Sequence, residues 1–286
     1  MIPFKVGRSA PANTFLAIWM AEAAGFYGDR GLQIEVVPMV GGREAGPSLM
    51  GGHIQLMHIG LSSLVRANAA GADLVAVGSL SNVIRGTLFG APGVTELKGG
   101  VFGISSAGSE SDAAASLALG RLGLARADVT VKEVGIGRLA ALLSGEITAA
   151  MLDEPQRSEA FKAGLPTIID FLPERVPWLY TSLAVTGAYL RENRETVRNF
   201  LAATMDGNRL AAADEARGKA VLAEALALED PETIDICYAN FRDFTPEYAE
   251  IDIAGAENII ATVAPGSGAV PADYIDTSLI DELRRG

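Results

Sequence analysis

The sequence contains few of the side chains on which metal centres and covalent catalysis depend. Its 286 residues include one cysteine, Cys237, and two histidines, His53 and His58. A single cysteine excludes an internal disulfide and a cysteine-based zinc or iron–sulfur cluster, and between apolar neighbours it is typical of a small buried residue. The histidines lie five residues apart in a predicted turn and strand, so their side chains should face opposite sides. We therefore expect no histidine-based metal site, no Ser-His-Asp triad and no cofactor.

Basic clusters and long apolar runs are missing as well. The chain has 23 Lys and Arg against 35 Asp and Glu, which gives a net charge of -12 and a pI near 4.7. Without a basic patch, nucleic acid is not an expected partner. No run of eighteen apolar residues occurs, so no membrane span is predicted. A strand predicted at Phe4 to Gly7 leaves no room for a signal peptide, so we expect either a cytosolic chain or a mature domain without its leader.

The first part of the chain alternates predicted strands with loops and helices. Hydrophobic residues make up 49% and charged residues 20% of the sequence, as in globular proteins of one large or two medium domains. Strands are predicted at 4–7, 33–37, 54–59 and 74–78. Helices are predicted at 14–24, in a short segment that ends at Met50, and from the loop 60–63 through Ala70. This order predicts an α/β sheet, in which ligands bind at the carboxyl ends of strands. The loops 9–13, 41–43 and 60–63 should therefore converge.

A second series of units begins with the stretch Val101 to Leu122. An apolar strand at 101–104 leads into a loop of small residues, Ser105, Ser106, Gly108 and Ser109, and a helix begins near Glu110. Small residues, hydroxyls and the free amides of a helix start suit an oxyanion, a carboxylate or a sulfonate. The alternative is an ordinary loop with good N-caps. Further strands are predicted at 129–134 and 149–152.

A short internal repeat indicates two similar lobes. Leu49-x-x-Gly52-x-Ile54 recurs as Leu142-x-x-Gly145-x-Ile147, each time where a helix should end and a strand begin. A strand at 181–186 should return to the first lobe, followed by helices at 194–228, 231–242 and 251–263. We expect lobe one at residues 1–85 plus 184–286, lobe two at 86–183, and a hinge near 82–90 and 177–186 with a cleft between the lobes.

The motifs of residues 4 to 190 resemble a known family. They are Ala21-Glu22-Ala23-Ala24-Gly25-Phe26-Tyr27 with Gly31-Leu32, Leu49-x-x-Gly52, Leu97-Lys98-Gly99, the loop Gly103 to Ser109, and Leu142-x-x-Gly145 followed by Leu152-Asp153-Glu154-Pro155. In this order they resemble the periplasmic substrate-binding proteins of ABC importers for nitrate, taurine, alkanesulfonates and thiamine precursors, the NMT1/THI5-like group. Gln55 departs from the pattern, because many relatives carry an aspartate there.

The resemblance implies a type II periplasmic-binding-protein (Venus-flytrap) fold, with two α/β lobes joined by a two-strand hinge. It implies a periplasmic monomer that captures a small organic anion and delivers it to an ABC permease. The anion is expected to be a sulfonate or carboxylate, and an aromatic or pyrimidine-like ring is compatible with it. One alternative is a cytosolic enzyme on this fold, a decarboxylase or a pyrimidine synthase, although one cysteine and two histidines do not supply the synthase's iron site. A ligand-sensing domain without transport is the other.

Candidate ligand-binding residues come from the resemblance and from the loops. Arg43 and Arg138 each follow a glycine-rich loop, where a guanidinium can clamp a carboxylate or sulfonate or else remain on the surface. Tyr180, near the second crossing, is placed for an aromatic ligand. Asp153 or its neighbour Glu154 should face the cleft. The full set is Ser9, Ala10, Asn13, Gly42, Arg43, Ser62, Ser105, Ser106, Gly108, Ser109, Arg138, Asp153 and Tyr180.

Overall fold

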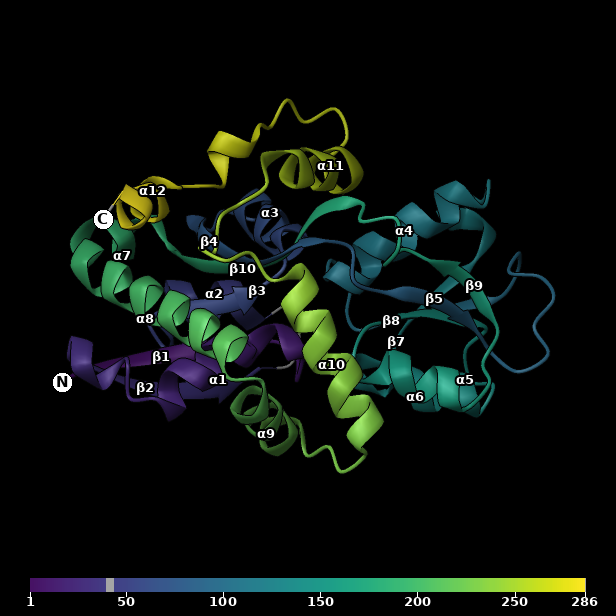
Figure 1. The fold of residues 1–286 in the computed structure, drawn as a ribbon. Helices are drawn as coiled ribbons and strands as arrows, with labels where there is room; N and C mark the ends of the chain where they lie inside the picture. The colour runs from purple at the N-terminus through teal and green to yellow at the C-terminus, as the bar shows by residue number, and fades with distance from the viewer. Residues whose placement is uncertain (40–43, 286) are drawn as a thin grey trace.

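A computed structural model describes residues 1–39 and 44–285 as two five-stranded sheets with helices around them (Figure 1). The first sheet has the order β2 (Leu32–Pro38), β1 (Ile2–Arg8), β3 (Leu56–Ile59), β10 (Pro177–Thr186), β4 (Leu74–Val83). The second has the order β7 (Thr130–Glu133), β6 (Val101–Ile104), β8 (Ala149–Leu152), β5 (Thr87–Gly90), β9 (Thr167–Asp170). The sheets form two lobes that lie side by side in Figure 1, as predicted.

The helices divide between the lobes. Around the first sheet lie α1 (Leu16–Ala23), α2 (Ala45–Met50), α3 (Leu61–Ala69), α7 (Gly187–Glu192), α8 (Arg194–Ala213), α9 (Glu215–Leu226), α11 (Ile253–Val263) and α12 (Ser278–Arg285). The second sheet carries α4 (Glu110–Arg121), α5 (Arg138–Leu143) and α6 (Gln156–Lys162), and α10 (Pro231–Phe244) contacts both α9 and α6. No helix in the described part of the chain combines the length and the apolar character that crossing a membrane requires.

The two sheets share one pairing pattern. In the first, β1 is parallel to β2 and β3, and β10 is antiparallel to β3 and β4. In the second, β6 is parallel to β7 and β8, and β5 is antiparallel to β8 and β9. The internal repeat occupies equivalent places, because it leads from α2 into β3 and from α5 into β8. Its glycines, Gly52 and Gly145, have φ angles of 68° and 75°, which favour glycine. The repeat predicted from the sequence is therefore confirmed.

Two strands were missing from the sequence-based prediction, and several were too short, among them those predicted at 74–78 and 181–186. All four residues of β5 are buried, so its pattern shows no alternation. The edge strand β9 is short and half-buried. The strand predicted at 74–78 continues to Val83, toward the second lobe. The helical stretch predicted at 194–228 divides at Asp214, whose side chain accepts a hydrogen bond from the Arg217 N–H and begins α9.

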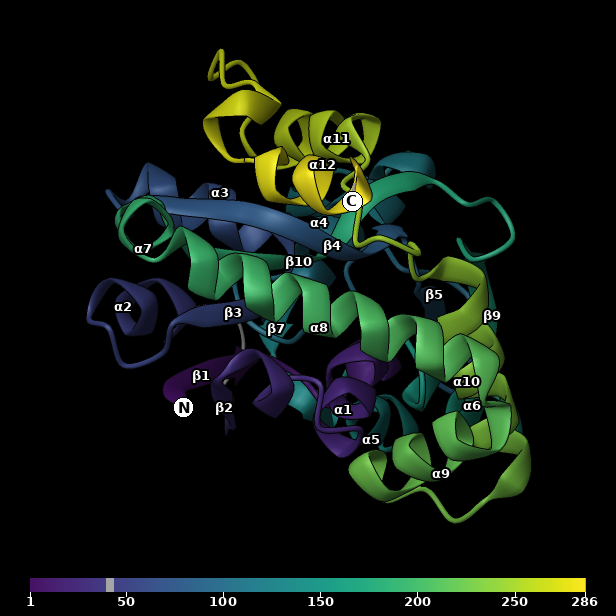
Figure 2. The same ribbon diagram turned by 60° about the vertical axis from the view of Figure 1, so that its left-hand side comes forward.

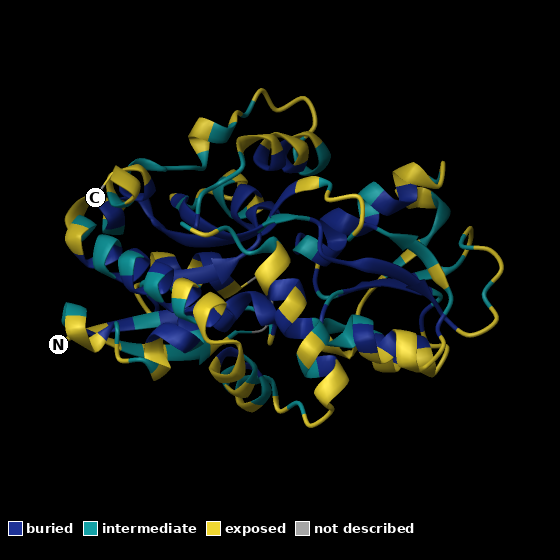
Figure 3. Ribbon diagram, viewed as in Figure 1, coloured by how far each residue is buried: buried dark blue, intermediate teal, exposed yellow. Residues whose placement is uncertain are grey.

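The core of the first lobe depends on a close helix crossing. Buried residues fill the central strands of both sheets, such as β3, β5 and β8 (Figure 3). Phe4 of β1 stacks on Phe200 of α8 with ring centroids 5.0 Å apart. Figure 2 shows α8 as a long helix along the outside of the first sheet, with α1 beside it. At the crossing, a Cβ on Gly207 would lie 2.2 Å from the carbonyl oxygen of Ala17 and 2.7 Å from the Cβ of Ala21. Only a glycine lets the two helices approach this closely.

Gly207→Ala should lower the free energy of unfolding by about 2 kcal/mol or more, because the new methyl group meets backbone atoms that cannot move aside cheaply. Urea unfolding measures this effect. The matched control is Gly120→Ala in α4, where an added Cβ meets no atom within 4 Å. Helix propensity alone should stabilise that variant, by up to about 1 kcal/mol. Equal effects of the two substitutions would show that the α1–α8 crossing is not tight.

Candidate functional site

A buried arginine lies at the point where the chain first passes from one lobe to the other. Arg85 stands between β4 and β5 and is 2% exposed. Its Nη2 donates to the side-chain oxygens of Asn13, at 3.2 Å, and of Asn240. Its Nη1 is buried and has no hydrogen-bond partner within residues 1–39 and 44–285. Burial lowers the pKa of Arg85 to about 10, which leaves the guanidinium charged at neutral pH.

Two asparagines hold this guanidinium from the side of the first lobe. Asn13 lies in the turn η1 (Asn13–Phe15) after β1, and its Nδ2 donates to the carbonyl of Cys237, at 2.8 Å, and to Asn240, at 3.1 Å. Asn240 and Cys237 belong to α10, more than 150 residues along the chain from Arg85. Asn13 was among the predicted site residues, whereas Arg85 and Asn240 were not. A lone arginine within the apolar stretch 74–91 is the signal in the sequence that points to Arg85.

Three of the predicted residues meet on the side of the second lobe. The Arg138 Nη2 lies 3.7 Å from the Asp153 Oδ1, and the Tyr180 hydroxyl donates to the Asp153 Oδ2 at 3.4 Å. Asp153 and Tyr180 both act electrostatically on Arg85. Arg138 is also anchored within its own lobe, because its Nε donates to the Met151 carbonyl at 3.0 Å. We refer to Asn13, Arg85, Arg138, Asp153, Tyr180 and Asn240 as the inter-lobe cluster.

A neutral histidine borders the inter-lobe cluster. The His58 Nε2 lies 3.2 Å from the Thr14 hydroxyl, and Phe15 packs edge-on against the ring with centroids 5.0 Å apart. The Nδ1 is buried and has no hydrogen-bond partner in the described chain. Burial, followed by the charges of Arg8 and Arg85, lowers the pKa of His58 to about 3. The imidazole is therefore neutral at physiological pH.

The loop predicted to bind an anion uses most of its donors internally. The hydroxyls of Ser105, Ser109 and Ser111 form a triangle with oxygens 2.8–2.9 Å apart, and Ser105 N–H donates to the Ser111 hydroxyl. The Gly108 N–H donates to Asp112 at 2.8 Å. Ser109 caps α4 through the Asp112 N–H. These hydrogen bonds are those of an ordinary loop with N-caps, which was the alternative to an anion-binding loop in the sequence analysis. The Ser106 Oγ is buried and has no partner in the described residues.

An acidic side chain that the sequence did not single out joins the lobes at Ser62. The Glu110 Oε1 accepts from the Ser62 N–H in the first turn of α3, at 2.8 Å. Its Oε2 accepts from the Trp178 Nε1, also at 2.8 Å. The Ser63 hydroxyl donates to the Gly108 carbonyl at 3.2 Å. The predicted residues Ser62 and Gly108 therefore lie where the lobes touch directly.

The remaining predicted residues lie elsewhere or outside the description. The Ser9 hydroxyl donates to the His58 carbonyl oxygen at 3.2 Å, and Ala10 is half-buried beside it in sequence. Gly42 and Arg43 fall outside the described residues. The prediction that these residues bind a ligand remains a prediction.

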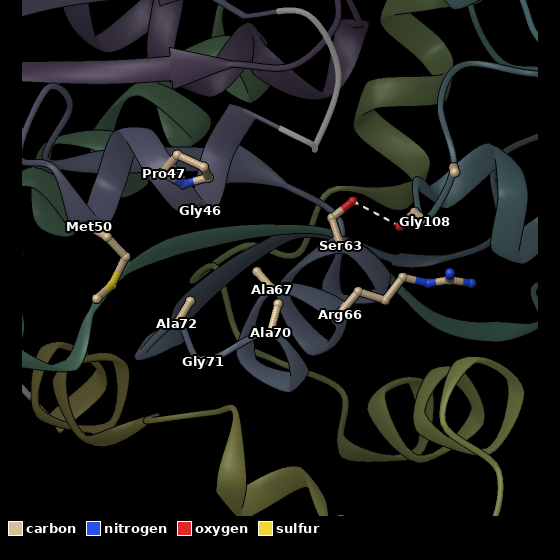
Figure 4. A pocket seen from close by; sticks show the side chains of 11 residues that line it. Gly46, Pro47, Met50, Ser63, Arg66, Ala67, Ala70, Gly71, Ala72 and Gly108 are labelled. Atoms are coloured by element: carbon tan, nitrogen blue, oxygen red, sulfur yellow. Dashed lines mark hydrogen bonds between the residues drawn. The ribbon is translucent and has the colours of Figure 1, made fainter.

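A separate pocket of about 460 Å³ lies between α2 and α3 (Figure 4). Its lining is mostly small and apolar: Gly46, Pro47, Met50, Ser63, Arg66, Ala67, Ala70, Gly71, Ala72, Ala107 and Gly108. Arg66 supplies its charge and lies 3.8 Å from Asp112. The pocket does not include the inter-lobe cluster. Within the described ranges, no group of three or more His, Cys, Asp or Glu side chains is placed to hold a metal ion.

Comparisons with known proteins agree with this architecture. A protein of Bordetella bronchiseptica RB50 is similar over 100% of this chain and 98% of its own, with 20% identity and a TM-score of 0.86. The alkanesulfonate-binding protein SsuA of Xanthomonas axonopodis pv. citri, bound to MOPS, is similar over 97% and 99%, with 18% identity and a TM-score of 0.78. The periplasmic nitrate-binding protein NrtA of Synechocystis PCC 6803 is similar over 100% and 89%, with 15% identity and a TM-score of 0.73.

At these identities the likeness shows the fold, which is that of the periplasmic binding proteins. No curated protein matches the sequence significantly. Residues 12–217, which are more than half of the chain, match the sequence profile described as NMT1/THI5 like. That match includes Asn13, Arg85, Arg138, Asp153 and Tyr180 of the inter-lobe cluster. The chain belongs to the NMT1/THI5-like family.

Proposed function

We propose that this chain is a solute-binding protein that captures a small organic anion between its lobes. The observation that carries the proposal is the buried Arg85, whose Nη1 has no acceptor in the described chain. A buried N–H donor without a partner costs free energy, and a guanidinium without its full set of partners costs more. The two oxygens of a carboxylate or sulfonate match the fork of a guanidinium. An anionic solute therefore supplies the hydrogen-bond acceptor that the described residues do not provide for the Arg85 Nη1.

The neighbours of Arg85 support a ligand held by both lobes. Asn13 and Arg85 come from the first lobe and the first crossing, whereas Arg138 and Asp153 come from the second lobe. The contacts of Asp153 with Arg138 and Tyr180 are long, at 3.7 and 3.4 Å, so its oxygens retain capacity for a donor on the ligand. Tyr180 offers a ring face for an aromatic solute. Ser9, Ala10, Ser105, Ser106 and Ser109 remain the outer members of the proposed site.

Closure about a hinge is part of the proposal. The division into residues 1–85 plus 184–286 and residues 86–183, with a hinge near 82–90 and 177–186, places Arg85 at the first crossing. The ends of β4 at Val83 and the start of β5 at Thr87 support this first boundary. The strand β10 pairs with the first sheet from Pro177 onward, so we propose that lobe two ends before Pro177 rather than at residue 183.

Sulfonate-binding and nitrate-binding proteins of the same fold support a role in import. We propose that the chain works as a monomer in the periplasm and delivers its solute to an ABC permease. If the full gene encodes no leader, the same solute-binding role falls in the cytoplasm.

The chemistry of the site favours binding over catalysis. The Thr14 hydroxyl and His58 form a pair that resembles a nucleophile with its base, but an imidazole with a pKa of about 3 is too weak a base at neutral pH. The thiol of Cys237 is also unsuited, because burial raises its pKa to about 12. We therefore favour the binding protein over a decarboxylase or a pyrimidine synthase on the same fold.

Thermal unfolding in the presence of acetate, benzoate, methanesulfonate or benzenesulfonate tests the proposal. An anion at about 100 times its Kd should stabilise the chain by about 2.7 kcal/mol, which raises Tm by roughly 5 °C. Native mass spectrometry of the purified protein identifies any solute that is retained. Arg85→Lys keeps the charge but loses the fork, and should weaken binding of the best anion by about 10- to 100-fold.

The exposed Arg285 provides the matched control, because Arg285→Lys makes the same change far from the inter-lobe cluster. The affinity of the Arg285→Lys variant for the same anion should equal that of the wild type. No stabilisation by any carboxylate or sulfonate, or equal affinities of the two variants, would contradict the proposed site.

The neutral state of His58 makes a prediction about pH. Between pH 6.5 and about 3 the unfolded chain binds a proton at His58 that the folded chain does not bind. The free energy of unfolding should therefore fall as the pH falls, by up to about 1.4 kcal/mol per pH unit from this residue. Urea unfolding at several pH values compares the wild type with His58→Gln, which should lack this part of the slope. Parallel slopes would show that folding does not lower the pKa of His58, and would reopen its role as a base.

A further inference from the structure

The carboxylate of Glu110 occupies a place that suits a bound anion. Glu110 is the first residue of α4, yet its side chain reaches the opposite lobe at the start of α3. There it accepts the Ser62 N–H and the Trp178 Nε1–H, both at 2.8 Å. Each carboxylate oxygen thus has one N–H donor, and all of the donors come from elements outside its own lobe.

The start of α3 is shaped for this side chain. The N-cap of α3 is Gly60, which has no side chain to cap the free N–H groups of the first turn. A Cβ at Gly60 would lie 1.9 Å from the Glu110 Cγ, so only a glycine admits the carboxylate. The positive end of the α3 dipole also favours a negative group there. Glu110 therefore serves α3 as its cap from the other lobe.

The charges around Glu110 act in opposite directions. Burial raises its pKa to about 7, while the donors at Ser62 and Trp178 and the charge of Arg66 act to lower it. Tyr180 of β10 lies within electrostatic range of the same carboxyl. Above pH 7 the carboxyl is ionised, with a donor for each oxygen. Arg85 shows the contrast, because its Nη1 has no acceptor in the described chain.

We propose that Glu110 is a specificity-determining residue whose carboxylate fills the anion position at α3 and leaves Arg85 as the place for a solute's anionic group. The inference rests on the proposed function of the inter-lobe cluster. Both the volume and the negative charge of Glu110 exclude a second carboxylate or a sulfonate from the amides of α3. Among the buried charged donors of the described residues, Arg85 then remains the one with a nitrogen that lacks an acceptor.

Removal of the side chain tests whether the start of α3 binds an anion. Glu110→Ala deletes a fragment with the shape of acetate, so free acetate should enter the space and restore the lost hydrogen bonds. At pH 8, where Glu110 is ionised in the wild type, sodium acetate should raise the Tm of Glu110→Ala well above its value in sodium chloride of equal ionic strength. The wild type provides the baseline, because any response at Arg85 is common to both proteins.

Two further variants serve as controls for the acetate response. Glu110→Gln fills the same space with a neutral amide and should show no acetate response beyond that of the wild type. Glu96→Ala removes an exposed carboxylate and should behave as the wild type.

If Glu110→Ala folds poorly, its refolding yield in acetate is compared with that in chloride instead of the Tm. Small-angle X-ray scattering should show a larger radius of gyration for Glu110→Ala in chloride, and a return toward the wild-type value in acetate.

An acetate response of Glu110→Ala no larger than that of the wild type would overturn the inference. That result would leave the proposed function intact, because the affinity of the wild type and of Arg85→Lys for carboxylates and sulfonates is measured separately. Conversely, no anion binding at Arg85 together with a full acetate response of Glu110→Ala would contradict the proposed function, and only the filled anion position at α3 would stand.

Discussion

The burial of the positive charge of Arg85 is the constraint on which the packing at the junction of the two lobes depends. Arg85 lies in the crossing from β4 to β5, where it has almost no contact with water. A buried guanidinium is tolerated only with hydrogen-bond acceptors and negative neighbours close by. The protein meets this demand from distant parts of the chain, with Asn13 near its start and Asn240 near its end on one side, and Asp153 on the other. Arg85 therefore ties segments from the start, the middle and the end of the chain together at the junction of the lobes.

Two charges at the lobe junction differ in how completely the protein satisfies them. The carboxylate of Glu110 has an N–H donor for each oxygen, whereas the guanidinium of Arg85 has one nitrogen without an acceptor among the residues that the structure describes. In a region of low dielectric constant, such a difference decides where an external group of opposite charge gains most. The neutral His58 beside the cluster adds a further polar nitrogen without a partner in the described chain. These features favour recognition of a solute rather than its chemical conversion.

The fold was predicted in outline because its signals are local. The strand at 101–104, the start of α4 at Glu110 and the strand at 149–152 coincide with the prediction, since apolar runs, glycines and capping serines lie next to one another in the sequence. The strands β5 and β9 were not predicted, because each is followed by another strand rather than by a helix and so lies outside the alternating units that marked most of the others. Four members of the inter-lobe cluster were among the predicted residues: Asn13, Arg138, Asp153 and Tyr180, which follow strand ends or crossings, where α/β sheets place their ligands.

The sequence by itself determined the two-lobe plan, through the repeat at Leu49 and Leu142 and the small-residue loops after the strands. It also determined the family, through motifs that keep their order along the chain. Only the tertiary structure decided which loop donors remain available. Ser105, Ser109 and Ser111 bond to one another, Glu110 takes the start of α3, and among the described residues the buried guanidinium nitrogen without an acceptor belongs to Arg85. The physical reason is that Glu110 and Arg85 bond to partners more than 40 residues away in the chain, and no local pattern records such pairs.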